Sequence, residues 1–421
     1  MHPPIHDAGR KADGAAHRPV LIDGGTLVLE DGTLENGALV LIEGRIAYAG
    51  PADLLPPEIA PPGGATVSLR ECERYDATGQ WVFPGFIDVH VHGGGGADTM
   101  DASVDSLRRI AEVHGAHGTT TMLATTTTEA HDRVIAAAKA VREAMALSAA
   151  PGWCGARIAG LHLEGPYVNP KRAGAQNPAF MRSADLGELG EIVSCLEEGF
   201  RLVTLAPELP GADEAIAFLR RCGVTVSMGH TDATFEQAFA ALQKGVTHVT
   251  HTYNAMRPLH HRDPGVVGAA FLSGSGVLCE VIADGIHVHP RAIEALWRAK
   301  GTSGLCLITD AIAATGMPEG EYELGRLKVS LKGRECRLAD GTLAGSVLTM
   351  DEAVGFMVRE VGVPVHEAAA MASLNPARAA RLEARKGALR VGKDADVAVL
   401  DSGFRAVATF VGGRLIFGRE A

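Results

Sequence analysis

Histidine and carboxylate residues stand at the ends of several short apolar segments of this chain. Imidazole nitrogen and carboxylate oxygen together suit Zn, Fe and similar divalent ions, which polarise carbonyl groups and acidify water. No cysteine joins the set, so a structural thiolate zinc site is not indicated. The residue types therefore predict a metal-dependent hydrolase. The six residues concerned are His90, His92, Glu164, His230, His251 and Asp310.

His90 and His92 close the segment WVFPGFIDVHVH and lie two residues apart. On a β-strand, residues i and i+2 point to the same face. Two imidazoles that enter one cavity need a shared partner, because burying polar groups without one is costly. We therefore predict that both bind a metal, with Asp88 nearby to orient them. The alternative is an HxH pair that arose by chance.

Glu164 lies in LHLEGPYVNP, and Asp310 closes GLCLITD. A carboxylate can span two cations, so we predict Glu164 as a bridging ligand rather than a loop cap. Asp310 is predicted as the general base, since a carboxylate beside a cation stays ionised and can pass a proton from water to a leaving group. The alternative for Asp310 is a helix cap. His162 and His248 are assigned to packing and structure.

A basic cluster follows the His251 segment, in HTYNAMRPLHHRDPG. It contains Arg257, His260, His261 and Arg262, and such a cluster is usually a solvated face. Beside a ligand-bearing strand end, however, it could hold an anionic group of a substrate. His287, at the end of a later strand, points to the same use.

The elements that position these residues alternate between strand and helix from about residue 82 to 310. This alternation predicts a parallel sheet. Closure into a (β/α)8 TIM-like barrel is favoured because five different strands supply the predicted site, and only a ring brings five strand ends together. The eight predicted strands are 82–90, 118–125, 157–163, 201–206, 224–229, 246–250, 277–282 and 304–309, and predicted helices include 104–114, 129–147, 212–221, 234–243 and 290–299.

Both ends of the chain are rich in short β segments separated by turns such as Asp31-Gly32 and Asn36-Gly37, which favour hairpins. We expect them to meet in a small β-sandwich domain beside the barrel. The predicted division is a disordered tail at 1–18, the small β domain at 19–80 and 383–421, and the metal-dependent hydrolase barrel at 81–382.

Composition limits the partners and the compartment. The formal net charge of −11 argues against nucleic acid and acidic membrane surfaces. No continuous apolar stretch suits a membrane span, and the first residues lack the apolar region of a secretory signal. The seven cysteines are widely spaced without a CxxC, so a reducing cytoplasm is expected.

Seven motifs, in order along the chain, resemble the N-acetylglucosamine-6-phosphate deacetylases of the amidohydrolase superfamily. The resemblance runs from about residue 20 to the end, and the final GALRVGKDADVAVLD is shared more widely across the superfamily. The motifs are PGFIDVHVHGGGG, GLHLEGPYVNP, SMGHTDAT, VTHTYNAM, ADGIHVHP, LITDA and LAGSVLTMDEAV.

The resemblance implies hydrolysis of N-acetyl-D-glucosamine 6-phosphate to D-glucosamine 6-phosphate and acetate, in amino-sugar catabolism or recycling. It implies that Glu164, His230 and His251 hold the principal metal and that Asp310 is the acid/base. It also implies a homodimer or homotetramer, in which a neighbouring subunit helps at the phosphate. The implied substrate contacts are Ala175, Gln176, Asn254, Ala255, Arg262, His287, Leu343, Ala344 and Gly345.

Two features vary within the family. Some members lack the HxH pair and bind one metal, so one or two divalent cations, Zn or Fe, are expected here. Gln176 stands where other members carry a histidine beside the substrate carbonyl. Glutamine donates a hydrogen bond but cannot be cationic. A second metal could therefore take over the polarisation of the carbonyl.

Three other functions are compatible with this superfamily. Cyclic-amide hydrolases of the superfamily often bridge two metals with a modified lysine at the end of strand four, but here that strand ends TLAPE. A non-catalytic binding protein would be marked by degenerate ligands, whereas all six residues are intact. The same deacetylation of N-acetylgalactosamine 6-phosphate is not excluded by the sequence.

Overall fold

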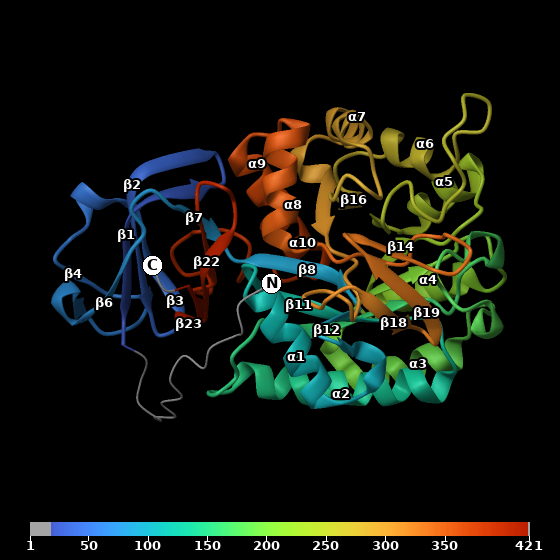
Figure 1. Cartoon of the computed structure of the whole chain (residues 1–421), viewed down its shortest axis with the longest axis horizontal. Coiled ribbons are helices and arrows are strands. Elements are labelled where there is room, and N and C mark those ends of the chain that lie inside the picture. The colour runs from blue at the N-terminus through green and yellow to red at the C-terminus, as the bar shows by residue number, and fades with distance from the viewer. Residues whose placement is uncertain (1–17, 420–421) are drawn as a thin grey trace.

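The computed structural model describes residues 18–419 and contains a barrel with a separate sheet beside it (Figure 1). Except for Arg18, the predicted tail lies outside the described residues. Among the helices described, none is long and apolar enough to cross a membrane. The predicted barrel with a small β domain built from both ends of the chain is confirmed, and the predicted β-sandwich is a single eight-stranded sheet in the structure.

Eight parallel strands form the barrel sheet, each hydrogen-bonded to the next in chain order. The ring closes near the carboxyl ends of the first and last strands, where the Asp310 amide donates to the His90 carbonyl at 2.9 Å and Val91 pairs with Ala311. The strands are β8 (Phe86–Val91), β11 (Thr119–Thr126), β12 (Arg157–Glu164), β13 (Phe200–Leu205), β14 (Thr225–Met228), β15 (His248–Val249), β16 (Leu278–Ile282) and β17 (Leu305–Ile308).

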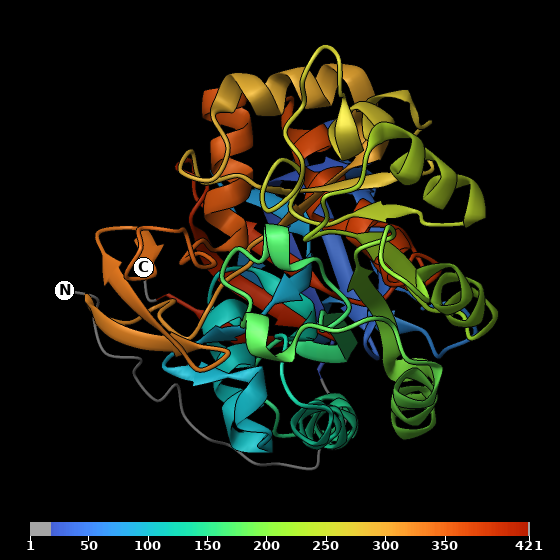
Figure 2. The same cartoon turned by 90° about the vertical axis from the view of Figure 1, so that its right-hand side faces the viewer.

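Helices surround these strands (Figure 2). Helix α4, for example, buries an apolar stripe of Ala215, Ile216 and Leu219 against the barrel. Helix α5 begins with a Thr234/Gln237 capping box and ends at Gly245, which has a φ of 110°. The helices are α1 (Val104–Gly115), α2 (His131–Ala149), α3 (Leu186–Leu196), α4 (Ala212–Arg221), α5 (Phe235–Lys244), α6 (Gly265–Leu272), α7 (Pro290–Lys300), α8 (Met350–Phe356), α9 (Val365–Ala369) and α10 (Asn375–Ala379).

The terminal segments form one eight-stranded, mainly antiparallel sheet, in which strands from the two ends of the chain lie side by side (Figure 1). A buried apolar cluster that includes Ile22, Leu39, Val397 and Phe410 joins residues from both ends. The strands are β1 (Val20–Leu29), β2 (Gly32–Ile42), β3 (Arg45–Pro51), β6 (Glu73–Asp76), β7 (Trp81–Pro84), β21 (Val397–Leu400), β22 (Ala406–Val411) and β23 (Arg414–Gly418).

The predicted strand at 82–90 is two strands in the structure. β7 pairs with β1 and β21 in the terminal sheet, and β8 starts the barrel. Gly85 separates them, and a Cβ there would lie 2.3 Å from Oγ1 of Thr120. The chain can therefore pass so close to β11 only with glycine at this point. The predicted domain limits themselves stay a prediction.

A three-stranded hairpin unit follows the barrel, as β18 (Gly320–Leu324), β19 (Leu327–Lys332) and β20 (Glu335–Arg337). It packs Leu324, Val329 and Leu331 against Ile312 and Ala344. The remaining short strands are β4 (Glu58–Ile59), β5 (Val67–Ser68), β9 (Gly93–Gly94) and β10 (Ala97–Asp98).

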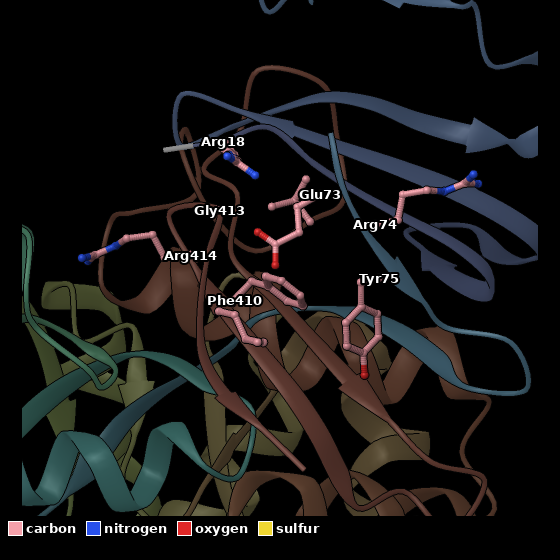
Figure 3. Close-up of a pocket in the computed structure, with 9 residues that line it drawn as sticks. Arg18, Glu73, Arg74, Tyr75, Phe410, Gly413 and Arg414 are labelled. Atoms are coloured by element: carbon pink, nitrogen blue, oxygen red, sulfur yellow. The ribbon is translucent and has the colours of Figure 1, made fainter. Parts of the chain in front are cut away.

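A cavity of about 270 Å³ lies in the terminal sheet. Figure 3 shows the Glu73 carboxylate pointing into it between Arg18 and Phe410, while Arg414 points away. None of the predicted site residues, all of which the structure describes, lines this cavity. The chemistry predicted from the sequence must therefore be sought in the barrel.

Candidate metal centre

Glu164, the last residue of β12, lies at the centre of a group of ligand-type side chains. Its Oε1 is 3.1 Å from Nε2 of His230 and 3.1 Å from Nε2 of His251. The two Nε2 atoms are themselves 3.0 Å apart. Three residues from separate strand ends thus direct one donor atom each to a common point.

The hydrogen bonds of the two rings test whether a cation fits this point. Nδ1 of His230 donates to the Arg172 carbonyl at 3.0 Å, and Nδ1 of His251 donates to the Asn254 carbonyl at 3.2 Å. A carbonyl only accepts, so in the neutral rings each proton sits on Nδ1 and each Nε2 carries a lone pair. Two lone pairs and a carboxylate at this separation repel unless a positive charge lies among them. The donor set therefore fits a divalent cation.

The HxH pair adjoins this group on its other side. Nε2 of His90 and Nε2 of His92 are 3.3 Å apart, so both rings enter the same space. Nε2 of His90 lies 3.4 Å from Oε1 of Glu164, and Nε2 of His92 lies 3.3 Å from Oε2. Oε1 of Glu164 therefore faces His230, His251 and His90, whereas Oε2 faces His92, so the carboxylate lies between the HxH pair and the other two histidines.

Asp310 follows β17 and lies against the HxH pair. Its Oδ1 is 3.5 Å from Nε2 of His90 and 3.3 Å from Nε2 of His92. Burial alone would raise the pKa of Asp310, but the neighbouring imidazoles lower it below its ordinary value. The carboxylate is thus ionised at neutral pH and can accept a proton.

The pKa values of the other groups show how strongly this cluster favours positive charge. Burial lowers the pKa of His92, but Asp310 and Glu164 outweigh it and raise the value to about 9. Burial would raise the pKa of Glu164, yet His90 and His230 hold it well below the ordinary value. A proton and a metal cation compete for the same lone pairs, so a site that binds protons this readily also suits a cation.

Three of the site residues have a left-handed backbone. The φ angles are 46° at His230, 27° at His251 and 50° at Asp310. Residues other than glycine rarely adopt such angles, and those that do concentrate at functional sites. At each position the chain leaves its strand and turns sharply, which leaves the side chain directed at the cluster.

Gln176 contacts the carboxylate of Glu164. The backbone N–H of Thr128 donates to Oε1 of Gln176 at 2.7 Å, which fixes the orientation of the amide. The amide nitrogen Nε2 in turn donates to Oε2 of Glu164. Gln176 therefore holds Glu164 in place, and its predicted contact with a substrate carbonyl stays a prediction.

Further predicted substrate contacts lie on three segments of the chain. Asn254 and Ala255 follow His251, and Ala255 accepts a hydrogen bond from the backbone of Thr231 at 3.2 Å. The segment 343–345 runs beside Asp310, whose carbonyl accepts from Ser346 N at 2.8 Å. Gly345 has a φ of 59°, and a Cβ there would lie 2.4 Å from Cγ2 of Ile312. Ala175 packs on the hairpin unit.

The basic cluster divides into residues with and without acidic partners. Arg257 is held by Asp232 at 3.1 Å and by Asp263 at 2.6 Å. Arg262 is exposed and, in the part of the chain that the structure describes, forms no ion pair with a carboxylate. Its Nη1 lies 2.9 Å from Nε2 of His261. Arg262 is thus available for an anion, although the structure gives it no contact with the ligand cluster.

His287 is the other residue predicted to bind an anionic group. Its Nδ1 lies 2.7 Å from Oδ2 of Asp284. Burial lowers the pKa of His287, but Asp284 outweighs this effect and raises it above the ordinary value. Asp284 therefore favours the protonated form of the ring, and a protonated imidazole suits an anionic group.

Two histidines assigned to packing have internal partners. His162 lies 3.0 Å from the Val89 carbonyl and 2.8 Å from Oγ1 of Thr204, and burial lowers its pKa to about 3. His248 contacts Glu280 at 3.0 Å. Glu280 itself was missed in the sequence, where the only signal is a lone carboxylate in the apolar run VLCEVI.

The chain matches the amidohydrolase family over residues 81–416. It is 38% identical over 401 residues to the N-acetylglucosamine-6-phosphate deacetylase of Bacillus subtilis, covering 94% of this chain and 97% of that protein. It is 38% identical over 389 residues to the N-acetylgalactosamine-6-phosphate deacetylase of Escherichia coli O157:H7, covering 92% and 97%.

Among solved structures, the chain is similar to a variant of the N-acetyl-D-glucosamine-6-phosphate deacetylase of Mycobacterium smegmatis in complex with N-acetyl-D-glucosamine-6-phosphate. The TM-score is 0.86 at 34% identity, and the likeness covers 95% of this chain and all of that one. Both the barrel and the terminal sheet are therefore shared.

Proposed function

The chain belongs to the amidohydrolase family, and we propose that it is a deacetylase that hydrolyses N-acetyl-D-glucosamine 6-phosphate to D-glucosamine 6-phosphate and acetate. The observation that carries this function is the meeting of Glu164, His230, His251 and the HxH pair at one point, with Asp310 beside them. The likeness to deacetylases over nearly the whole chain supports the sugar phosphate as substrate.

We propose that Glu164, His230 and His251 hold the principal divalent cation, and that His90 and His92 with Glu164 and Asp310 can hold a second. The mixed imidazole and carboxylate set suits zinc or iron. When bound, such a cation supplies Lewis acidity, which makes water a better nucleophile at neutral pH and polarises the amide carbonyl.

Asp310 performs the proton transfers of the reaction. Its Oδ1 takes the proton of the attacking water and then delivers it to the nitrogen of the departing amine, so the amine leaves neutral. Gln176 keeps Glu164 fixed during these steps through its hydrogen bond to Oε2. Because one residue serves both transfers, no separate acid is required.

Substrate binding is assigned to the segments beside the cluster. Asn254, Ala255, Ala175 and the segment 343–345 contact the sugar and its acetamide. Arg262 and His287 bind the phosphate, since a guanidinium can hold two phosphate oxygens at once and an imidazolium adds a third donor.

The direct test is acetate release from the two epimeric substrates by the purified protein, together with a metal analysis of the same sample. Faster turnover of N-acetylglucosamine 6-phosphate supports the proposed substrate. The galactosamine epimer remains a second candidate, because one relative covering most of the chain bears that name. Absence of acetate release from both would overturn the proposal.

We further propose a cytoplasmic homodimer or homotetramer. The seven cysteines, none of which forms a disulfide in the described structure, fit a reducing compartment. A neighbouring subunit would then approach the exposed loop of Arg262 and help to bind the phosphate.

Arg262→Ala should raise KM for the 6-phosphate by roughly 10-fold to 100-fold, the cost of losing charge-assisted hydrogen bonds. Activity on unphosphorylated N-acetylglucosamine should barely change. Steady-state kinetics on both substrates check this. Arg298→Ala, which removes an exposed charge from α7, is the matched control and should behave as wild type. Equal losses on both substrates would assign Arg262 to the loop or the subunit contact.

His90→Ala and His92→Ala should remove only a second ion. With two metals per subunit in the wild type, each variant should retain one, measured by elemental analysis after dialysis. One metal in the wild type and an unchanged content in both variants would contradict the second site. The HxH pair would then be a packing feature that lies beside the metal.

A further inference from the structure

Glu280 is a fully buried carboxylate in β16, between apolar residues. Burying a carboxylate is costly unless hydrogen bonds satisfy its oxygens. Oε2 accepts from Nδ1 of His90 and from the backbone N–H of His251, both at 3.0 Å. Oε1 accepts from Nε2 of His248 at 3.0 Å. Every contact of this carboxylate therefore leads to a histidine, and two of them are predicted metal ligands.

The contact with His90 determines which ring nitrogen is free. A carboxylate only accepts, so the proton of the neutral His90 ring sits on Nδ1. Nε2 then carries the lone pair, and it is Nε2 that faces Glu164, His92 and Asp310. Without the acceptor at Nδ1, the ring could rotate or take the other tautomer, in which Nε2 cannot bind a cation.

The contact with His251 acts on the backbone. His251 has a φ of 27°, a conformation that residues other than glycine rarely adopt. Its N–H donates to the Glu280 carboxylate, and the next amide, that of Thr252, donates to the Glu280 carbonyl at 2.9 Å. Two hydrogen bonds to one residue thus hold the turn from which the His251 ring reaches Glu164.

The other ligand rings are held differently. His230 and His251 donate from Nδ1 to backbone carbonyls, and Nδ1 of His92 has no hydrogen-bond partner among the described residues. Glu280 is thus the carboxylate that touches one ligand of the HxH pair and the backbone of one ligand of the Glu164 group. It lies where it can align the two groups with each other.

We propose that Glu280 is a positioning residue that fixes the His90 ring and the His251 turn together, so that both metal-ligand groups keep their geometry. The proposal rests on the ligand assignment made under the proposed function. What matters is an acceptor at the position of Oε2, and the negative charge is secondary.

Two conservative variants distinguish the effect of the position of the Glu280 oxygens from the effect of their charge. Glu280→Gln loses the charge but can keep an oxygen at the Oε2 position. Its amide N–H can donate to Nε2 of His248 once the His248 proton moves to Nδ1, which has no partner among the described residues. Glu280→Asp keeps the charge but withdraws the oxygens by one methylene. If Glu280 acts by positioning, Glu280→Asp should therefore bind metal more weakly than Glu280→Gln.

The measurement is the zinc affinity of the metal-free full-length protein, by competition with a chelator, with the visible spectrum of the cobalt-substituted protein as a report on ligand geometry. Glu280→Asp should weaken metal binding by roughly 10-fold to 100-fold, as loss of an outer partner of a ligand histidine does. Its cobalt spectrum should change. At saturating metal its kcat should fall while KM stays near wild type. Glu280→Gln should remain close to wild type in metal affinity, in its cobalt spectrum and in kcat.

Asp351→Asn is the matched control for a buried carboxylate. Asp351 accepts from His117 at 3.2 Å, from Thr349 at 2.5 Å and from the backbone of Ala406 at 3.0 Å, and none of these three residues is a proposed ligand. This variant should lower the unfolding temperature without changing zinc affinity. Loss of affinity in Asp351→Asn would mean that affinity merely follows stability, which would overturn the reading of the Glu280 variants.

Wild-type affinity in Glu280→Asp, or an equal loss in Glu280→Gln and Glu280→Asp, would overturn the proposal. These outcomes are distinct from failure of the proposed function. If the wild-type protein binds no metal or releases no acetate, the ligand assignment itself fails. If the wild type does both and only the Glu280 variants disagree with expectation, the positioning role alone is wrong.

Discussion

Asp310→Asn should reduce kcat by roughly 10²-fold to 10⁴-fold, which is the range that a general acid/base contributes. The effect should lie toward the upper end because Asp310 serves both proton transfers. Its pKa is held below the ordinary value by the imidazoles of His90 and His92 despite burial, so the wild-type group is ionised and basic at neutral pH. An amide has the same shape but accepts no proton.

The controls for this variant are its metal content and its unfolding temperature. Asp310 is outside the Glu164 group, so metal content at that group and the unfolding temperature of Asp310→Asn should remain close to wild type. Single-turnover acetate release in the metal-loaded variant separates chemistry from binding. A kcat near that of wild type would remove Asp310 from the mechanism and return it to the alternative of a helix cap.

His230→Ala and His251→Ala should each abolish stable binding of the principal metal and, with it, acetate release. Each removes one of three donors whose atoms lie within 3.1 Å of one another, so two donors remain. The loss of affinity should exceed the roughly 10-fold to 100-fold that follows from loss of an outer partner. Elemental analysis after dialysis and chelator competition measure it.

A variant of a surface histidine is the matched control, because it shows what the loss of a histidine outside the cluster does to metal binding and activity. His131, at the start of α2, pairs with Glu191 on the surface at 2.9 Å and contacts no ligand. His131→Ala should bind metal and release acetate as the wild type does. Retention of one tightly bound metal per subunit in both His230→Ala and His251→Ala would show that the principal cation lies elsewhere, with the HxH pair as the first place to examine.

The pH dependence of metal binding follows from the contacts between these histidines and carboxylates. Glu164 keeps a pKa well below the ordinary value and His92 one of about 9, so without metal this cluster holds protons that a cation must displace. Metal affinity should therefore increase as pH rises toward 9.

The sequence by itself determined the types of the candidate ligands and the fold that gathers them. Strand and helix alternate from β8 to β17, and parallel strands place their carboxyl ends at one face. Spacing of two in His90 and His92 sends both rings to one side, as their Nε2 separation of 3.3 Å shows. These features depend on the spacing of residues within a strand and on the order of elements along the chain, and both can be read from a single sequence.

Only the tertiary structure decided how the ligands are held. Glu280 reaches His90 across 190 positions of chain, and Gln176 turns its amide to Glu164 through a hydrogen bond from Thr128. The predicted strand 82–90 divides at Gly85 between two sheets, and Thr120 of β11 passes too close there for a side chain. Such contacts depend on register between strands and on the path of loops. No periodicity along the chain encodes them, so they exist only once the barrel has closed.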